Sequence, residues 1–132
     1  MPDARKNIVF VCVENANRSQ IAEAFARMHG ADTVNVYSAG SRPSGMVNPK
    51  AVASMRQRGY DLTTHRSKSL NDLPDVEWSA AITMGCGDAC PNLRAARRED
   101  WAIPDPKHLP PEQFADVRDL IERKVQSLLR EL

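Results

Sequence analysis

The sequence lacks several features that would assign it to particular protein classes. None of its apolar runs approaches the roughly 20 residues that a membrane-spanning helix needs. Its 18 basic and 17 acidic residues leave a formal net charge of only +1. Aromatic residues make up 5% of the 132 residues, and there are only three cysteines. The balanced charge gives no general electrostatic reason to bind nucleic acid, so we expect neither a nucleic-acid partner nor a membrane association.

The amino terminus gives no sign of export. Residues 1–7 are polar and lead directly into an apolar run, without the charged and then apolar layout of a signal peptide. We therefore expect a cytoplasmic protein, in which an odd number of cysteines favours thiol chemistry or buried free thiols over a disulfide framework. The length is that of one compact domain, so we predict a single domain over residues 1–132.

Strand and helix patterns alternate along the chain. Short apolar runs predict buried strands at 8–11, 34–37 and 80–84. Apolar residues at helical spacing, among them His29, predict helices at 21–29, 49–59 and 111–129. Gly30 is expected to end the first helix in a left-handed conformation. Asn48 is expected to cap the second helix.

This alternation predicts the α/β class, with a parallel sheet between two layers of helices. In such a fold, ligands bind at the carboxyl ends of the strands. Residues 60–77 suggest a short strand or turn and a short helix, and residues 85–111, which are rich in glycine and proline, predict an irregular surface segment that carries function. Arg94, Arg97 and Arg98 within that segment are expected to be solvated.

The main chemical motif joins the first strand to the first helix. It has the form Cys-x5-Arg-Ser and reads Cys12-Val13-Glu14-Asn15-Ala16-Asn17-Arg18-Ser19. Successive N–H groups in a loop that ends at a helix amino terminus can converge on a tetrahedral anion. The Arg18 guanidinium can add two parallel hydrogen bonds. We therefore predict that residues 13–19 bind a phosphate-like oxyanion.

The same loop makes Cys12 a candidate nucleophile. The N–H groups, the helix terminus and Arg18 all favour thiolate over thiol. Ser19 can donate a hydrogen bond to that thiolate or cap the helix, and the sequence leaves both roles open. Asn15 can brace the loop through its amide or adopt a left-handed backbone there. The alternative is that Cys12 is an ordinary buried core thiol.

With this loop, Ser38-Ala39-Gly40 and Asp105-Pro106, the sequence resembles the low-molecular-weight protein tyrosine phosphatase superfamily over nearly its whole length. The resemblance implies a four-stranded parallel sheet in a three-layer α/β/α fold and a covalent adduct on Cys12. It also implies that Asp105 is a general acid, although an Asp before Pro can simply form a turn. Glu14 departs from the pattern, because an acidic side chain in an anion loop must point away from the anion.

The other two cysteines, Cys86 and Cys90, follow the strand predicted at 80–84 and so belong to the same edge of the sheet as Cys12. Their spacing allows them to form a disulfide with each other. They can also be inert core thiols. They are weak candidates for zinc ligands, because the histidines have no ligand spacing, and we predict no metal and no cofactor.

The stretch 82–91, followed by Asp100-Trp101 and Pro104-Asp105-Pro106, resembles the arsenate reductases of this superfamily. The resemblance implies that Cys12 attacks arsenate, that a Cys12/Cys86 disulfide forms, and that Cys90 converts it into Cys86/Cys90. It implies arsenate as substrate, phosphate as its analogue and thioredoxin as the partner that reduces the enzyme. Other members of the wider group use glutathione with glutaredoxin, or mycothiol.

Two other functions remain open on the sequence alone. The first is a tyrosine phosphatase of the same fold, although such enzymes usually carry an aromatic residue after Asp-Pro, where this chain has Lys107 and His108. The second is a sensor of oxyanions or redox state that has no catalytic activity.

Overall fold

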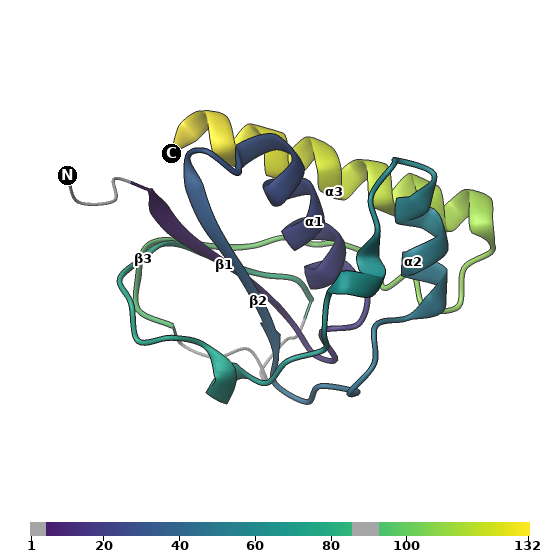
Figure 1. Ribbon diagram of the computed structural model, residues 1–132, viewed down its shortest axis with the longest axis horizontal. Helices are drawn as coiled ribbons and strands as arrows, with labels where there is room; N and C mark the ends of the chain where they lie inside the picture. Colours follow the sequence, from purple (N-terminus) through teal and green to yellow (C-terminus); the bar gives the residue numbers. More distant parts are fainter. Residues whose placement is uncertain (1–4, 86–92) are drawn as a thin grey trace.

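As Figure 1 shows, a parallel sheet, in which β1 is one of the two inner strands, lies beside helices α1 (Arg18–Gly30) and α3 (Pro111–Glu131). The computed structural model describes residues 5–85 and 93–132. Four strands lie in the order β2-β1-β3-β4, and their bounds are Lys6–Cys12 for β1, Val34–Gly40 for β2, Trp78–Thr83 for β3 and Ala95–Asp100 for β4. All three pairings are parallel. The predicted strands at 8–11 and 34–37 are confirmed, and the third ends at Thr83 instead of residue 84.

Strand β4 corrects the prediction that residues 85–111 are irregular throughout. Its sequence is AARRED, which has no β-branched or large apolar residue, so apolar patterning gives no signal for it. Its hydrogen bonds to β3 and its place at the edge of the sheet allow polar side chains to alternate between half-buried and exposed. Arg94 and Arg98 are exposed, as expected, whereas Arg97 forms ion pairs with Glu99 and Glu131.

In the residues that the structure describes, three α-helices and two short 3-10 helices accompany the sheet. They are α1 (Arg18–Gly30), α2 (Pro49–Arg56), α3 (Pro111–Glu131), η1 (Leu62–Thr64) and η2 (Leu70–Asp72). Asn48 caps α2 as predicted, because its Oδ1 accepts a hydrogen bond from the Lys50 N–H at 2.9 Å. Helix α2 ends three residues before Gly59, which has φ +79° and forms the turn that follows. In the described part of the chain, no helix is long and apolar enough to span a bilayer.

The end of α1 differs from the prediction in two respects. Gly30 is the last helical residue and is not left-handed, and the C-cap is Ala31 in the right-handed region. A Cβ on Gly30 would lie 3.0 Å from the Leu129 side chain and 3.2 Å from that of Val34, so glycine lets α1 approach α3 and β2 closely. His29, predicted on the buried stripe, is exposed, and its Nε2 lies 2.8 Å from the Glu122 carboxylate.

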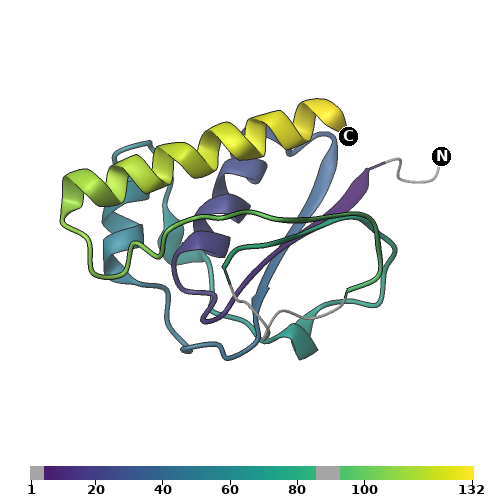
Figure 2. The same cartoon turned by 180° about the vertical axis from the view of Figure 1, so that it is seen from behind.

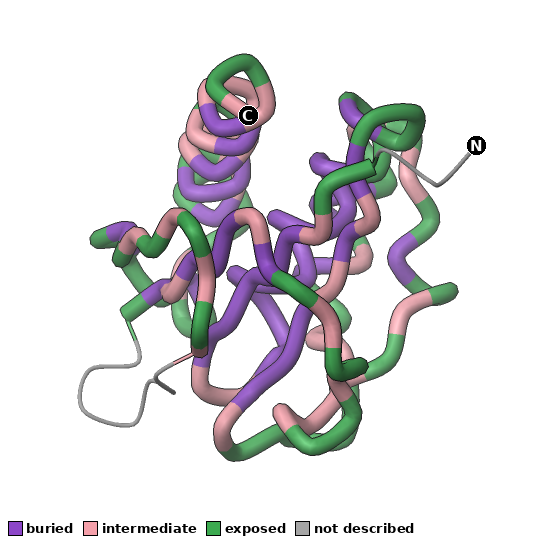
Figure 3. The backbone as a smooth tube through the Cα atoms, turned by 90° about the vertical axis from the view of Figure 1, so that its left-hand side faces the viewer, coloured by how far each residue is buried: buried purple, intermediate pink, exposed green. Residues whose placement is uncertain are grey.

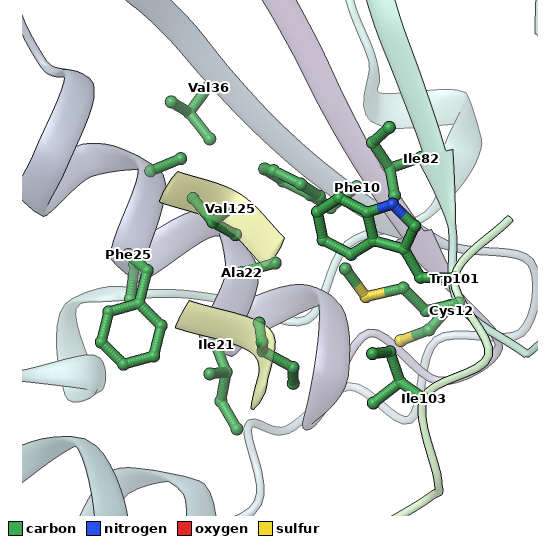
Figure 4. Packing of buried hydrophobic residues seen from close by; sticks show 14 of the residues in the cluster. Phe10, Cys12, Ile21, Ala22, Phe25, Val36, Ile82, Trp101, Ile103 and Val125 are labelled. Carbon is green, nitrogen blue, oxygen red and sulfur yellow. The ribbon is translucent and has the colours of Figure 1, made fainter. Parts of the chain in front are cut away.

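Side chains of β1 alternate between two apolar clusters, one on each face of the sheet. Ile8, Phe10 and Cys12 pack in the larger cluster with α1 and α3, as the close-up in Figure 4 shows for two of them. Val9 and Val11 pack in the smaller cluster on the opposite face. Buried residues therefore concentrate in the central strands and in the inner sides of α1 and α3 (Figure 3).

The two faces of the sheet are covered by different structures. Helices α1 and α3 contact each other on one face (Figure 2). On the other face, the described cover is η2 with its following segment, which contributes Leu70, Leu73 and Val76 to the smaller cluster. The four-stranded parallel sheet is confirmed, and in the described residues the second outer layer contains a 3-10 helix in place of an α-helix. The carboxyl ends of β1, β3 and β4 meet at one edge, where the loops carry the site.

Candidate active site

A pocket of about 340 Å³ lies at the carboxyl edge of the sheet. The loops that follow β1, β3 and β4 all contribute to it, and its lining residues are Cys12, Val13, Glu14, Ala16, Asn17, Arg18, Gly85 and Asp105. The structure therefore brings the predicted loop and the predicted acid together in one cavity, although Asp105 is 93 residues from Cys12 in the sequence.

The loop after β1 turns its carbonyl groups outward. The carbonyl oxygens of residues 13–16 accept hydrogen bonds from groups outside the loop, which are Arg42 N at 2.8 Å, Ser44 N at 3.1 Å, Gln20 Nε2 at 3.0 Å and Asn48 N at 3.1 Å, respectively. In a planar trans peptide the N–H points opposite to the carbonyl of the preceding residue. The N–H groups of residues 14–17 are therefore directed to the inside of the loop, which is the geometry of an anion-binding nest.

Cys12 ends β1 at the floor of this pocket. Cys12 is a free thiol and is 3% exposed to solvent. Its Sγ lies 2.9 Å from the Ser19 Oγ in the first turn of α1. In Figure 4 the Cys12 sulfur lies at the edge of the larger apolar cluster, which also contains Ile103 and Trp101. The sulfur therefore has apolar residues on one side and the loop with its hydroxyl donor on the other.

The start of α1 decides between the two roles considered for Ser19. The N-cap residue is Asn17, whose side chain makes no capping hydrogen bond. Ser19 lies inside the helix, and its hydroxyl faces the Cys12 sulfur and the Asn15 amide. The geometry thus fits a hydrogen bond to the thiol or thiolate and does not fit a helix cap.

Arg18 is held across the pocket by the loop that follows β4. Its Nη1 donates a hydrogen bond of 3.1 Å to the Ile103 carbonyl, and its Nη2 lies 3.9 Å from the Asp105 carboxylate. The arginine side chain is 10% exposed, whereas that of Asp105 is 54% exposed. The guanidinium is therefore fixed in place over the loop, while the acid remains at the entrance.

Gly85 makes room for this arginine. It has φ +71°, and a Cβ built on it would lie 2.5 Å from the Arg18 Nη1. We expect Gly85→Ala to raise KM for the oxyanion substrate about tenfold or more, because the methyl group must displace the guanidinium. The left-handed backbone should add a stability loss of about 1–2 kcal/mol.

Gly59→Ala is the matched control for this prediction. Gly59 has φ +79°, but a Cβ there would have nothing within 4 Å, so alanine introduces the backbone strain without the contact. Thermal unfolding and steady-state kinetics of both variants separate the two effects. A Gly85→Ala enzyme with the same KM as Gly59→Ala would show that Gly85 does not position Arg18.

Asn15 occupies the centre of the loop and combines the two roles considered for it. It is left-handed, with φ 50°, and fully buried. Its Nδ2 donates to the Ser19 Oγ at 2.7 Å and to the Ser38 Oγ at 3.0 Å. Its Oδ1 accepts from the Gln20 Nε2 and the Lys68 N–H, both at 2.8 Å. The Asn15 side-chain amide thus donates two hydrogen bonds and accepts two, which satisfies its full hydrogen-bonding capacity.

A buried carboxylate supports this network from behind. Glu23 accepts a hydrogen bond from the Ser38 hydroxyl at 2.5 Å, and the ammonium of Lys68 lies 3.5 Å from it. Burial acts to raise the pKa of Glu23, but His65, Lys68, the Ser38 hydroxyl and Arg27 together leave this pKa below its usual value. Glu23 is therefore ionised at neutral pH and orients the Ser38 hydroxyl, whose oxygen is left to accept from Asn15.

Gly40, the last residue of β2, lies too close to the loop after β1 to carry a side chain. It is paired with Cys12 in the sheet register. A Cβ at Gly40 would lie 2.5 Å from the Val13 carbonyl oxygen and 2.9 Å from the Asn15 nitrogen. Glycine therefore allows the loop to pack directly on β2.

Glu14 lies at the rim of the pocket. Its side chain is 42% exposed, and both of its carboxylate oxygens lie 3.4 Å from the Lys107 Nζ. Cys86 and Cys90 lie outside the described residues, so the structure says nothing of their position. In the described part, no three His, Cys, Asp or Glu side chains are grouped as metal ligands.

Sequence reasoning did not identify several residues of this site. Gly85, Ile103 and Lys107 contact the predicted residues from distant parts of the chain. Only Gly85 has a local signal, because a glycine directly after a buried strand often marks a close approach or a turn. The role of the Ile103 carbonyl does not depend on the type of side chain, so the sequence cannot indicate it. Lys107 is notable in the sequence only because related phosphatases usually have an aromatic residue after Asp-Pro.

Comparison with known proteins assigns the family. Residues 7–132 match the family described as "Low molecular weight phosphotyrosine protein phosphatase". The chain belongs to this low-molecular-weight phosphatase family. The fold class predicted from the resemblance is thereby confirmed.

Within the low-molecular-weight phosphatase family, this chain is similar to proteins named arsenate reductase. The arsenate reductase of Staphylococcus aureus (strain Newman) is 39% identical over 127 residues, which cover 93% of this chain and 95% of that relative. A solved structure of an arsenate reductase in the phosphate binding state has 32% identity and a TM-score of 0.87, over 96% of this chain and 98% of that one. The thioredoxin-dependent arsenate reductase of Corynebacterium glutamicum has 26% identity and a TM-score of 0.78, over 99% of this chain and 63% of that one.

Proposed function

We propose that this protein reduces arsenate to arsenite and that Cys12 is the nucleophile. The observation that carries the proposal is the loop after β1, whose outward carbonyls leave the N–H groups of residues 14–17 facing inward beside the Cys12 sulfur and Arg18. A tetrahedral oxyanion suits that arrangement of donors. The similarity to named arsenate reductases over nearly the whole chain supports arsenate as the substrate.

In the first step, the Cys12 thiolate attacks the arsenic atom of bound arsenate. A sulfur–arsenic bond forms and an arsenic–oxygen bond breaks, and Asp105 supplies the proton with which that oxygen leaves as water. Arg18 and the inward N–H groups stabilise the negative charge on the remaining oxygens. The position of Asp105 in the lining of the same pocket as Cys12 and Arg18 supports this role.

In the second step, the Cys86 thiolate attacks the Cys12 sulfur. The electron pair of the sulfur–arsenic bond passes to arsenic, which leaves as arsenite, and a Cys12/Cys86 disulfide remains. Cys90 then attacks Cys86, so that Cys12 is released as thiolate and a Cys86/Cys90 disulfide forms. Cytoplasmic thioredoxin is the proposed reductant of that disulfide, which the similarity to the thioredoxin-dependent enzyme supports. The scheme uses no cofactor.

The alternative of a tyrosine phosphatase shares the first step. Cys12, Arg18 and an acid suffice for it, so weak hydrolysis of phosphate esters is compatible with the site. The residues after Asp105-Pro106 favour the reductase, because Lys107 and His108 are both exposed and polar where a platform for a phenyl ring would lie.

Arsenate-dependent oxidation of reduced thioredoxin tests the proposal. The wild-type protein should turn over steadily, whereas Cys90→Ser should release about one arsenite per enzyme and then stop with a Cys12/Cys86 disulfide, a loss of at least about 100-fold in steady turnover. Mass spectrometry of the stopped enzyme detects that disulfide.

Cys86→Ser is the matched variant, because it should form the Cys12 adduct but release no arsenite. Steady turnover by Cys90→Ser would exclude the relay. Hydrolysis of p-nitrophenyl phosphate without any arsenate turnover by the wild type would favour the phosphatase.

A further inference from the structure

Two oppositely charged side chains meet at the rim of the anion pocket. Glu14 belongs to the loop after β1, and Lys107 follows Asp105 in the loop after β4. The Lys107 Nζ lies 3.4 Å from both carboxylate oxygens of Glu14. The two residues are 93 positions apart in the sequence, so this contact depends on the fold.

Glu14 presents an electrostatic problem for a site of this kind. It lines the pocket together with a second acid, Asp105. A carboxylate close to a bound dianion repels it, by an amount that depends on the local dielectric and on the salt concentration. Arg18 faces Asp105 at 3.9 Å, and Lys107 faces Glu14, so each acid of the pocket has a cation beside it.

Lys107 is held in position through its own backbone. Its N–H donates a hydrogen bond of 3.1 Å to the Asp105 Oδ1, and its carbonyl accepts one of 3.0 Å from the Lys50 Nζ. These two hydrogen bonds fix the backbone of Lys107 beside the pocket. The exposed ion pair still pays the rotamer entropy of two long side chains, so its expected effect on binding is modest.

We propose that Lys107 is a positioning residue for oxyanion binding, which neutralises Glu14 and holds its carboxylate at the rim. The ligand class is a tetrahedral, multiply charged oxyanion such as arsenate or phosphate. The inference rests on the proposed function, because it requires that the pocket bind such an anion. It explains how an acidic residue is tolerated in this loop: a basic residue from the loop after β4 compensates it.

A double-mutant cycle with Lys107→Met and Glu14→Gln tests this role, with the dissociation constant of inorganic phosphate as the readout. Phosphate binding is measured by calorimetry and by protection of Cys12 from alkylation, at low ionic strength. Lys107→Met should weaken phosphate binding about three- to tenfold, because it leaves Glu14 uncompensated. In the Glu14→Gln background, the same Lys107→Met change should alter phosphate binding less than about twofold, because the carboxylate that Lys107 compensates is absent.

Two further measurements separate this role from a general effect of charge. Lys6→Met removes the same charge at the opposite end of β1 and should change phosphate binding less than twofold. At about 0.5 M salt, the difference between Lys107→Met and wild type should shrink, since the charges are exposed. In arsenate turnover, Lys107→Met should raise KM more than it lowers kcat.

A loss of phosphate binding on Lys107→Met that is as large in the Glu14→Gln background as in the wild type would overturn the inference, since the lysine would then act independently of Glu14. A wild-type protein that binds neither phosphate nor arsenate would instead contradict the proposed function. The two failures are therefore distinguishable in one set of titrations.

Discussion

Replacing Cys12 by serine is expected to reduce arsenate-dependent thioredoxin oxidation by at least about a thousandfold. A serine hydroxyl is far less acidic than a thiol, so the loop cannot generate an anionic nucleophile from it at neutral pH. Serine also cannot form the sulfur–sulfur bond that releases arsenite. The measurement is the coupled thioredoxin assay with arsenate, supported by detection of arsenite.

The same variant should still fold and bind an oxyanion. Cys12 is 3% exposed and its Sγ lies 2.9 Å from the Ser19 hydroxyl, which can serve as a hydrogen-bond partner for a new hydroxyl at this position. Phosphate binding by Cys12→Ser should therefore remain measurable by calorimetry, with an unchanged cooperative unfolding transition.

Arg18→Lys provides the complementary variant. Lysine keeps the charge but loses the planar pair of donors and the contact with the Ile103 carbonyl, so phosphate binding should weaken while Cys12 stays intact. Residual turnover of Cys12→Ser clearly above about 0.1% of wild type would contradict the assignment of the nucleophile, whatever the result for Arg18→Lys.

The parts of this fold that the sequence predicts are those with local patterns. Strand β1 is a continuous apolar run, and the loop from Cys12 to Ser19 places its nucleophile, its N–H groups and its arginine within eight consecutive residues. A site of that kind depends on one strand-to-helix connection, so recognising the connection places most of its groups. Asn48 at the start of α2 is predictable for the same reason, because a helix cap acts over three residues.

The features that the sequence does not predict depend on distant contacts. Strand β4 forms through pairing with β3, although its own residues are mostly polar or charged. Gly30 looks like a helix terminator, but its function is to fit against Leu129, which lies in the last helix. The hydrogen bond from Arg18 to the carbonyl of Ile103 leaves no trace in residue types, because every residue has a carbonyl.

Glu14 illustrates the same limit within the site itself. The sequence requires the side chain of an acid in the anion loop to point away from the anion, but it does not show what holds that side chain there. The ion pair with Lys107 is visible only in three dimensions, because nothing local connects residue 14 with residue 107. Lys107 is noticeable in the sequence only because tyrosine phosphatases of this fold usually have an aromatic residue after Asp-Pro.

Asn15→Ala is expected to cause the largest loss of stability among single substitutions in the loop. The side chain is fully buried and makes four hydrogen bonds with Ser19, Ser38, Gln20 and the Lys68 backbone. Removing it leaves several of these buried groups without a partner, at a cost of about 1–3 kcal/mol for each group that neither water nor repacking satisfies. The left-handed backbone adds about 1–2 kcal/mol for alanine. We expect a total loss of about 3–5 kcal/mol in the free energy of unfolding, measured by urea denaturation.

Asn15→Gly separates the two causes of this loss. Glycine tolerates φ 50° without strain but also lacks the amide, so it removes the hydrogen bonds alone. The difference between the alanine and glycine variants should equal the backbone strain, and the difference between glycine and wild type should equal the loss of the network, apart from the greater chain entropy of glycine in the unfolded state.

The activity of the glycine variant then shows whether the network matters beyond stability. Asn15 connects the Ser19 hydroxyl, which faces the Cys12 sulfur, to Ser38, which is oriented by the ionised Glu23. If this connection holds the loop in its anion-binding shape, kcat/KM of Asn15→Gly should fall about 100-fold under conditions where the variant is fully folded. A folded glycine variant with wild-type kcat/KM would show that the outward hydrogen bonds of the loop carbonyls are sufficient to shape the nest without the Asn15 side chain.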